Sequence, residues 1–494
     1  MRTACFGSRA QSRPLLAVLG LALVLAGSAL APSPPRAQAP ADSPGARGVE
    51  GNWQGTIQGM IRIVFHFQRD SLDALTGTMD SPDQGAFGLA IDTISFAGDS
   101  LRFEMQRIRG AYAGRLEATG DSISGYWTQG GFTLPLHLAR QAKPIELRRP
   151  QEPKKPYPYA EDTVRIENRA AGVSLAGTLT KPSAGGPFPA VLLITGSGPE
   201  DRDETVFGHR PFLVLADHLT RQGIAVLRVD DRGVGGSSGS QRTATSEDFA
   251  SDVLAGVAFL KARRDIDPKR IGLIGHSEGG LIAPMAAVRA RDVAFIVLLA
   301  GPGLRGDSLL LLQNAALLRA SGVGDEAIAR QLTAMRRVLA RVVEGADSAA
   351  VFRAAREMVE AQLASVPAEQ RRAFGSSDSL AIGATRQYLF PWMRFFIGFD
   401  PRPTLERVKC PVLALNGAKD LQVTPAENLA AIEQALKRGR NPDFTVRELP
   451  GLNHLFQAAA TGAVSEYAQI EETIAPAALE EMSAWILART SPRR

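Results

Sequence analysis

The sequence contains few of the residues that form disulfide bonds and metal sites. Only two of its 494 residues are cysteine, Cys5 and Cys410, and only six are histidine. Neither a C-x-x-C nor an H-E-x-x-H pattern occurs, which argues against a dedicated zinc site. Cys5 lies in a segment that we expect to be removed, so Cys410 has no partner for an intrachain disulfide. A chain of this length must instead rely on hydrophobic cores, enough for two or three domains.

The chain also lacks an excess of charge of one sign. Its 56 Lys and Arg residues exceed its 51 Asp and Glu residues by five, and four of the basic residues lie in residues 1–41, which contain no acid. The remainder therefore carries a net charge of about +1. A balance this close to neutral provides no electrostatic surface for nucleic acid, and we expect no nucleic-acid partner.

Residues 1–41 are typical of a secretory signal peptide. Basic residues precede an apolar run at Leu15–Leu30, and small residues follow it as far as Ala39 and Ala41, the two expected cleavage points. The run is shorter than a typical membrane span, and no second long apolar run follows. We therefore expect an exported protein, periplasmic or secreted, without stable membrane association after cleavage. An uncleaved N-terminal anchor is the alternative interpretation.

Residues 49–140 predict a domain of antiparallel β-strands. Apolar residues occupy alternate positions in residues 61–67, 101–105 and 134–138, which is the period of a strand with one buried face. Short turns rich in Gly, Asp and Ser separate such runs, a pattern typical of a small barrel or sandwich. We interpret the domain as a packing module without a ligand of its own.

Residues 141–160 predict a linker. They contain five prolines among basic residues, a composition that favours extended backbone over a packed core. We interpret the basic run as a solvated segment rather than a surface for membranes or nucleic acid. The linker would separate the β domain from residues 161–494.

Residues 161–494 predict a doubly wound, mostly parallel α/β domain. Near-continuous apolar runs alternate with helical patterns, as strands buried on both faces of a parallel sheet require. These runs are residues 189–194, 224–230, 270–275, 295–300 and 411–417. Residues 303–403 contain helical spacing without a strand, and this insertion between two strands predicts a helical lid.

A candidate nucleophile follows the third of these runs. Gly275-His276-Ser277-Glu278-Gly279 stands between a predicted strand and a predicted helix. G-x-S-x-G in that context is the nucleophile elbow, in which a strained turn lifts the serine hydroxyl above the sheet. We therefore predict that Ser277 is a catalytic nucleophile.

Such a serine needs a base, and the base needs an orienting acid. His454 is the only histidine after Ser277, and the usual order in this type of sheet is serine, acid, histidine. Asp420 directly follows the strand at 411–417 and is therefore the preferred acid. Asp443 precedes a strand, and Glu427 lies one turn into the next helix, so both are weaker candidates.

The oxyanion of the reaction needs two backbone N–H donors. One is expected from Glu278, directly after the nucleophile, and the other from the tight turn after residues 189–194, where Ser197 is preferred over Gly198. We interpret the Glu278 side chain as a solvated or paired surface acid rather than a proton carrier.

Five motifs occur in one order between Ile194 and Phe456: ITGSGPEDRDE, VDDRGVGGSSG, IGLIGHSEGG, PVLALNGAKD and PGLNHLF. Together they resemble the α/β-hydrolases of the bacterial esterase and serine-aminopeptidase-like group, over roughly residues 160–490. Exported members of that group often carry a small N-terminal β domain. The resemblance implies, by position, a nucleophile, an acid, a base and two oxyanion donors: Ser277, Asp420, His454, and Ser197 with Glu278. One departure is Thr195-Gly196, where many such hydrolases have His-Gly.

Two glycine- or acid-rich segments suggest other chemistry but lack its full pattern. The segment that starts at Gly196 has Asp201 in place of the third glycine of a dinucleotide fingerprint. Residues 200–204, EDRDE, lack the spacing of a calcium loop, and we interpret them as a loop paired through Arg202. We therefore expect neither a metal nor an organic cofactor.

The end of the predicted lid is rich in aromatic residues. Six of the twelve residues 388–399 are aromatic, in a chain with only 6% aromatics. Most of them are expected to form the core of the lid or its seat on the α/β domain. Because the segment leads into the strand that carries Asp420, we expect Trp392, Phe395 and Phe396 to line a substrate pocket.

These observations favour a serine hydrolase that cleaves small carboxylic esters through an acyl-enzyme on Ser277. A serine aminopeptidase or acyl-peptide hydrolase, acting on short peptide-like substrates, is the nearest alternative, because the same triad cleaves amides. An inactive hydrolase that binds glycan or peptide through its β domain is an alternative of another class.

Overall fold

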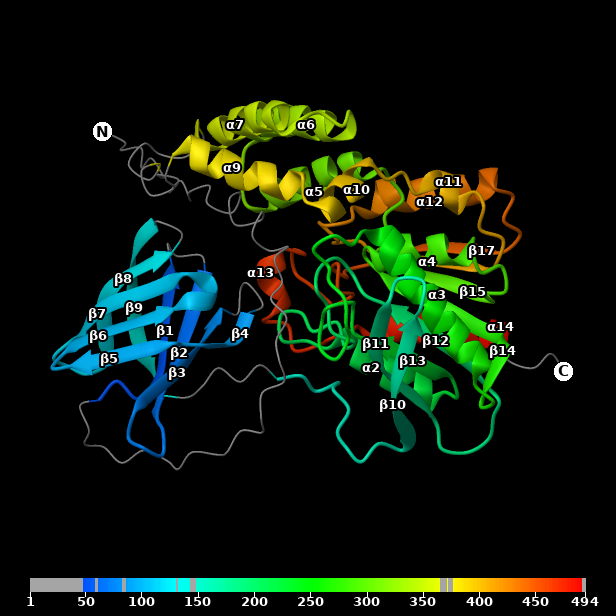
Figure 1. Cartoon of the computed structure of the whole chain (residues 1–494), viewed down its shortest axis with the longest axis horizontal. Helices are drawn as coiled ribbons and strands as arrows, with labels where there is room; N and C mark the ends of the chain where they lie inside the picture. The colour runs from blue at the N-terminus through cyan, green and yellow to red at the C-terminus, as the bar shows by residue number, and fades with distance from the viewer. Residues whose placement is uncertain are drawn as a thin grey trace, which may run out of the picture.

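The computed structural model describes residues 48–490, except 58–60, 82–85, 130–131, 143–147, 365–370 and 372–375. The predicted signal peptide and its cleavage points lie outside the described residues. Two sheets, one of nine strands and one of eight, form separate parts of the molecule (Figure 1). No helix within the described ranges has the length and apolar character needed to cross a membrane.

The nine-stranded sheet is the predicted antiparallel β domain, curled into a half-barrel (Figure 1). Its order is β4-β3-β2-β1-β9-β8-β7-β6-β5, so nearly all neighbours are consecutive in the chain. The strands are β1 (Gly51–Ile57), β2 (Ile61–Arg69), β3 (Leu75–Ser81), β4 (Ala86–Ala90), β5 (Thr93–Ala97), β6 (Ser100–Met105), β7 (Gly110–Leu116), β8 (Ser122–Gln129) and β9 (Phe132–Gln141). The alternation seen in the sequence places one face of each strand inside.

Aromatic side chains fill the inside of the half-barrel. Phe65, Phe103, Tyr112 and Trp127 are buried, with neighbouring ring centroids 4.8 to 6.4 Å apart. Trp53 is fully buried as well, and its indole N–H donates to the carbonyl of Val49 at 2.7 Å. A core of this kind stabilises the domain by burial and packing.

The eight-stranded sheet has the order β10-β11-β13-β12-β14-β15-β16-β17. The strands are β10 (Tyr159–Asn168), β11 (Val173–Pro182), β12 (Phe188–Ile194), β13 (Ala225–Val229), β14 (Ile266–His276), β15 (Phe295–Leu299), β16 (Val412–Gly417) and β17 (Phe444–Leu449). From β13 to β17 all neighbours are parallel, whereas β10 and β11 are antiparallel. The predicted α/β fold is confirmed, although the sequence pattern did not indicate the two antiparallel strands.

Helices cover both faces of this sheet, as continuous apolar strands require. Alternate residues of β12 belong to two different cores: Ala190 and Leu192 pack with one set of helices, Val191 and Leu193 with the other. The first set includes α3 (Ser246–Ala262), α4 (Gly279–Ala287) and α12 (Pro425–Arg438), and the second α2 (Pro211–Arg221) and α14 (Pro476–Thr490). The short helix α13 is Val464–Tyr467.

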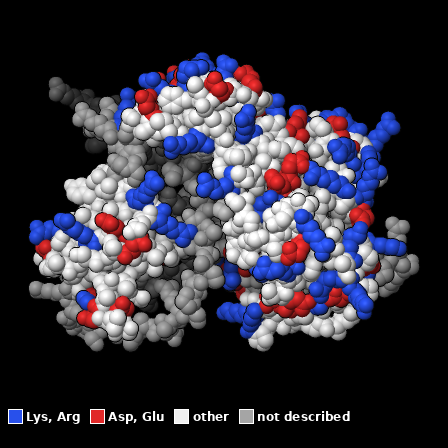
Figure 2. Space-filling view, in the orientation of Figure 1, with Lys and Arg blue, Asp and Glu red and all other residues white. Residues whose placement is uncertain are grey.

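A helical lid stands between β15 and β16, as predicted for residues 303–403. Its helices are α5 (Gly306–Ala320), α6 (Asp325–Val343), α7 (Ser348–Ala364), α9 (Ser377–Tyr388), α10 (Pro391–Gly398) and α11 (Arg402–Leu405). Figure 1 shows α6, α7 and α9 to the upper left of this sheet, with α5 and α10 closer to it. Charged side chains cover the visible outer surface of the lid (Figure 2).

The segment after residue 147 is docked on the hydrolase part rather than free. Arg149 donates hydrogen bonds to the carbonyls of Phe207, Gly208, Ala468 and Ile470 at 2.9 to 3.1 Å. Gln151 accepts the N–H of Thr473 and of Ile474 at 2.5 and 3.0 Å. The expectation of a solvated segment is therefore wrong for these two residues, because their side chains satisfy backbone groups of two distant loops.

Candidate active site

Ser277 occupies a sharp turn at the end of β14. Its φ of +52° lies in the left-handed region, which costs a non-glycine residue energy and occurs at nucleophile elbows. The flanking glycines leave no room for a side chain: a Cβ on Gly275 would lie 2.0 Å from the Gly279 carbonyl oxygen, and one on Gly279 would lie 2.2 Å from that of Ile194. The Ser277 N–H donates to the Leu299 carbonyl at 2.8 Å, which ties the turn to β15.

Asp420 and His454 meet beside the carboxyl ends of β16 and β17. His454 Nδ1 lies 2.7 Å from Asp420 Oδ2, and the two residues are only 4% and 2% exposed. The N–H groups of Gln422 and Val423 donate to the other carboxylate oxygen at 2.8 and 2.9 Å. A carboxylate held in this way fixes Nδ1–H as the donor, which leaves His454 Nε2 to accept a proton.

The two weaker acid candidates lie elsewhere. Asp443 pairs with Arg489 at 2.6 Å, near the start of β17. Glu427 is exposed in the first turn of α12. Of Asp420, Asp443 and Glu427, Asp420 is therefore the one that lies against His454.

The loop after β12 lies directly against the nucleophile. A Cβ on Gly196 would lie 3.3 Å from the Cβ of Ser277. The Gly196 N–H donates to Glu204 Oε1 at 2.7 Å, so it already has a hydrogen-bond acceptor within the protein. This leaves Ser197 as the next N–H along the loop, and the Thr195 hydroxyl anchors the loop by donating to Asp231 at 2.8 Å.

The side chain of Glu278 is buried, which corrects the expectation of a solvated surface acid. It is 1% exposed, and its Oε1 accepts the Ser246 hydroxyl at 2.6 Å and the Trp392 indole N–H at 2.7 Å. Burial raises the pKa of the Glu278 carboxyl group, although the hydrogen bonds from Ser246, Trp392 and Ser197 oppose this effect. In the chain, Glu278 directly precedes the first residue of α4.

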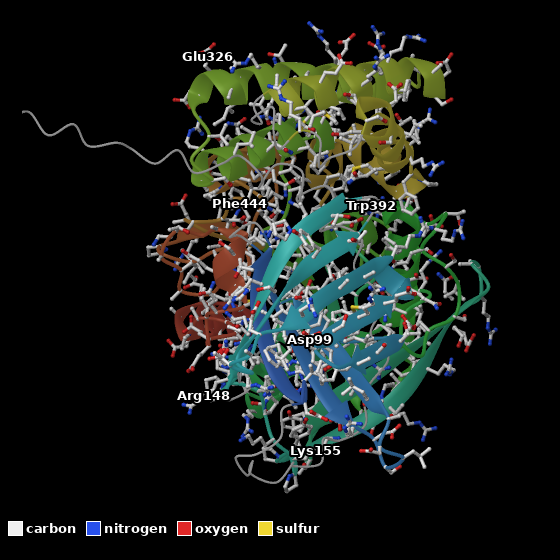
Figure 3. All side chains as sticks on the ribbon, turned by 90° about the vertical axis from the view of Figure 1, so that its left-hand side faces the viewer. Asp99, Arg148, Lys155, Glu326, Trp392 and Phe444 are labelled. Atoms are coloured by element: carbon white, nitrogen blue, oxygen red, sulfur yellow. The ribbon has the colours of Figure 1, made fainter. Side chains whose placement is uncertain are left out.

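Trp392 connects the lid to the site through that hydrogen bond. Its ring stacks on Phe396 with centroids 5.2 Å apart, and Phe395 stacks on Phe399 at the same distance. Phe396 is 6% exposed and belongs to the core, whereas Trp392 and Phe395 are half-buried. Figure 3 labels Trp392 at the level where the lid helices meet the parts below them. Of the three predicted pocket residues, Trp392 is thus the one that bonds to the residue beside Ser277.

The sequence analysis missed a second buried ionisable pair in the site. His276 Nδ1 lies 2.9 Å from Glu204 Oε1, and the two residues are 7% and 3% exposed. Glu204 is the last residue of EDRDE, the loop that the sequence predicts to be paired through Arg202. Arg202 does pair with a carboxylate, Asp230, at 2.7 Å. No sequence spacing connects Glu204 with His276, so only the fold could reveal the pair.

No group of three or more His, Cys, Asp or Glu side chains in the described part of the chain has the arrangement of a metal site.

Comparison with known proteins decides the family. Residues 210–458, just over half of the chain, match the family described as Serine aminopeptidase, S33. The chain belongs to this family of α/β-hydrolases. The matched range includes Ser277, Asp420 and His454.

Individual relatives of this S33-family hydrolase include esterases. Esterase EstD of Thermotoga maritima is 29% identical over 241 residues, which cover 46% of this chain and 58% of that protein. The chain thus spans somewhat more than half the length of this relative. The structure of the Pyrococcus furiosus esterase Pf2001 aligns with 70% of this chain and 98% of its own at 18% identity and a TM-score of 0.41. The α/β-hydrolase GrgF from Penicillium sp. sh18 aligns with 67% and 100% at 17% identity and a TM-score of 0.41.

Proposed function

We propose that this hydrolase is a serine carboxylesterase that forms an acyl-enzyme on Ser277. The observation that carries the proposal is the buried 2.7 Å contact between His454 Nδ1 and Asp420, at the same edge of the sheet as the strained Ser277 turn. The similarity to EstD supports an ester as the substrate class.

The reaction would begin with attack of Ser277 Oγ on the ester carbonyl carbon. His454 Nε2 takes the serine proton, and Asp420 stabilises the imidazolium that forms. The N–H groups of Ser197 and Glu278 would donate to the oxyanion. His454 then gives its proton to the leaving alcohol, and a water molecule activated by His454 hydrolyses the acyl-enzyme.

We further propose that the protein acts outside the cytoplasm. The support is the signal-peptide pattern of residues 1–41, with its apolar run at Leu15–Leu30. Small esters that reach an exported enzyme would be its substrates.

The nucleophile is tested by Ser277→Ala with Ser321→Ala as a control, since Ser321 is exposed at the end of α5. Ser277→Ala should reduce kcat on p-nitrophenyl acetate about a million-fold, as in other triads, while Ser321→Ala retains activity. A fluorophosphonate probe should label Ser277 alone. Labelling of another residue, or undiminished activity of Ser277→Ala, contradicts the proposal.

The substrate class is tested by comparing p-nitrophenyl esters with aminoacyl p-nitroanilides. A carboxylesterase should show the higher kcat/KM on the esters even after correction for their greater intrinsic reactivity. Higher corrected values on the anilides would establish the aminopeptidase alternative, which the family description also accommodates.

A further inference from the structure

The ring of His276 bridges two loops of the site. Its Nδ1 lies 2.9 Å from Glu204 Oε1, and its Nε2 lies 3.0 Å from the carbonyl oxygen of His454. A carbonyl oxygen can only accept, so Nε2 must donate. Glu204 Oε1 also accepts the Gly196 N–H at 2.7 Å. An ionised Glu204 accepts from Nδ1 as well, and a ring that donates from both nitrogens is an imidazolium.

These contacts reach three segments of the proposed site: the nucleophile turn, the oxyanion loop and the loop of the base. His276 directly precedes the nucleophile in the chain. Through Glu204 it holds Gly196, whose Cα faces the Ser277 side chain, and through Nε2 it holds the backbone of the proposed base. Glu204 itself adopts a φ of +52°, a strained conformation that the surrounding contacts must maintain.

We infer that Glu204 and His276 form a positioning ion pair that sets the distances between the nucleophile, the oxyanion loop and the base. The inference rests on the proposed function but assigns a role outside the Ser277, Asp420 and His454 triad. Because Glu204 accepts the Gly196 N–H, the next N–H in the loop, that of Ser197, is the one left to bind the oxyanion.

The charge on His276 is consistent with its surroundings. Burial disfavours the charge, but the Glu204 carboxylate and the hydrogen bonds to Glu204 and the His454 carbonyl outweigh it, so the pKa of His276 is raised. The titratable groups that face the ring are Glu204, Asp420 and His454, whose ring centroid lies 4.9 Å away.

Two isosteric substitutions in one loop test the inference. Glu204→Gln removes the partner charge of His276. Glu200→Gln is the matched control, because Glu200 lies in the same loop and bonds through its backbone to Asp231 rather than to His276. On p-nitrophenyl acetate, Glu204→Gln should reduce kcat about a hundredfold, the scale of a misplacement of about 1 Å. The KM of Glu204→Gln should stay within about threefold of the unmodified protein's value. For Glu200→Gln, both kcat and KM should stay within about threefold of the unmodified protein's values.

The pH profile separates positioning by an ion pair from a merely structural role. Without the carboxylate, the pKa of buried His276 should fall, because the ring loses the charge that favours its protonated form. The alkaline limb of kcat should then move to lower pH in Glu204→Gln and stay in place in Glu200→Gln. Two outcomes overturn the inference. One is an equal loss of kcat in both variants. The other is a loss of kcat in Glu204→Gln that is accompanied by a lowered melting temperature while the limb of the pH profile stays in place.

A measurement on the unmodified protein covers the case in which Glu204→Gln does not fold. In protein with ¹⁵N-labelled histidine, NMR should show His276, assigned by its contacts with the His454 ring, protonated at both nitrogens at pH 7. A singly protonated ring overturns the inference. Fluorophosphonate labelling of Ser277 in the same sample tests the proposed function separately, so failure of one is distinguishable from failure of the other.

Discussion

The β domain and the hydrolase part bury different kinds of residue. Apart from buried tyrosine and tryptophan, Ser81 is the one buried residue with a polar side chain among the described residues of the β domain, whereas residues 148–490 contain 25. Those include five ionisable groups at the proposed site: Glu204, His276, Glu278, Asp420 and His454. Burying such groups is costly unless they are paired. The chain therefore buries ionisable side chains, at a cost in stability, in the part that carries the proposed chemistry.

The filled half-barrel also bears on the binding-protein alternative. Its inner face holds Trp53, Phe65, Phe103, Tyr112 and Trp127 packed against one another. Ring-to-ring packing of this kind gives these side chains a structural role. The interpretation as a packing module remains a prediction, and the variants below compare the two regions directly.

The largest expected effect comes from the buried acid of the triad. Asp420→Asn should lower kcat about ten-thousand-fold, because an amide at this position no longer fixes Nδ1–H of His454. Asp443→Asn is the matched control and should be mild, since Asp443 contacts Arg489 near the start of β17. Steady-state kinetics on p-nitrophenyl acetate measures both. A severe loss in Asp443→Asn with a mild one in Asp420→Asn would reassign the acid.

The next prediction concerns the border between the two regions. Arg149→Ala should lower the free energy of unfolding of the hydrolase part by about 3 kcal/mol, because four carbonyls lose a charged donor. Arg148→Ala, at an exposed neighbouring position, should change it by less than about 0.5 kcal/mol. Denaturant unfolding measures both values. Equal, small effects would show that the segment after residue 147 belongs energetically to neither region.

The sequence predicted those features that depend on local patterns. Alternation identified the β domain, apolar runs identified β12 to β16, and the strand-to-helix context identified the Ser277 turn. The contact of Asp420 with His454 followed from chain order and from the rule that functional side chains gather at the carboxyl ends of parallel strands.

Features that depend on contacts between distant segments could not be predicted. Glu204 lies 72 residues from His276, and Trp392 lies 114 residues from Glu278. No periodicity relates such pairs. For the same reason Glu278 was expected at the surface, because its burial depends on the lid helix that covers it.

A smaller effect is expected at the contact between lid and site. Trp392→Ala should change the ratio of kcat/KM for short-acyl and longer-acyl p-nitrophenyl esters by about tenfold, the scale of one or two apolar contacts. Trp392→Phe keeps a ring but removes the donor to Glu278, so it should retain most of the acyl-chain preference. Equal losses on every ester, together with a lowered melting temperature, would make Trp392 a structural residue instead.

The smallest effect tests whether the β domain is separate from the chemistry. Tyr112 is 2% exposed, and its hydroxyl donates to the Leu136 carbonyl at 3.1 Å inside the half-barrel. Tyr112→Phe removes this hydrogen bond without changing the ring, so the free energy of unfolding of the β domain should fall by about 1 kcal/mol. Tyr126→Phe is the matched control, because Tyr126 is 59% exposed and its hydroxyl is solvated in both states. Neither variant should alter kcat/KM on p-nitrophenyl acetate, since the hydroxyl is enclosed by the core of its own domain. A loss of activity in Tyr112→Phe alone would mean that the packing of the half-barrel is transmitted to Ser277, and the two regions would then have to be treated as one energetic unit.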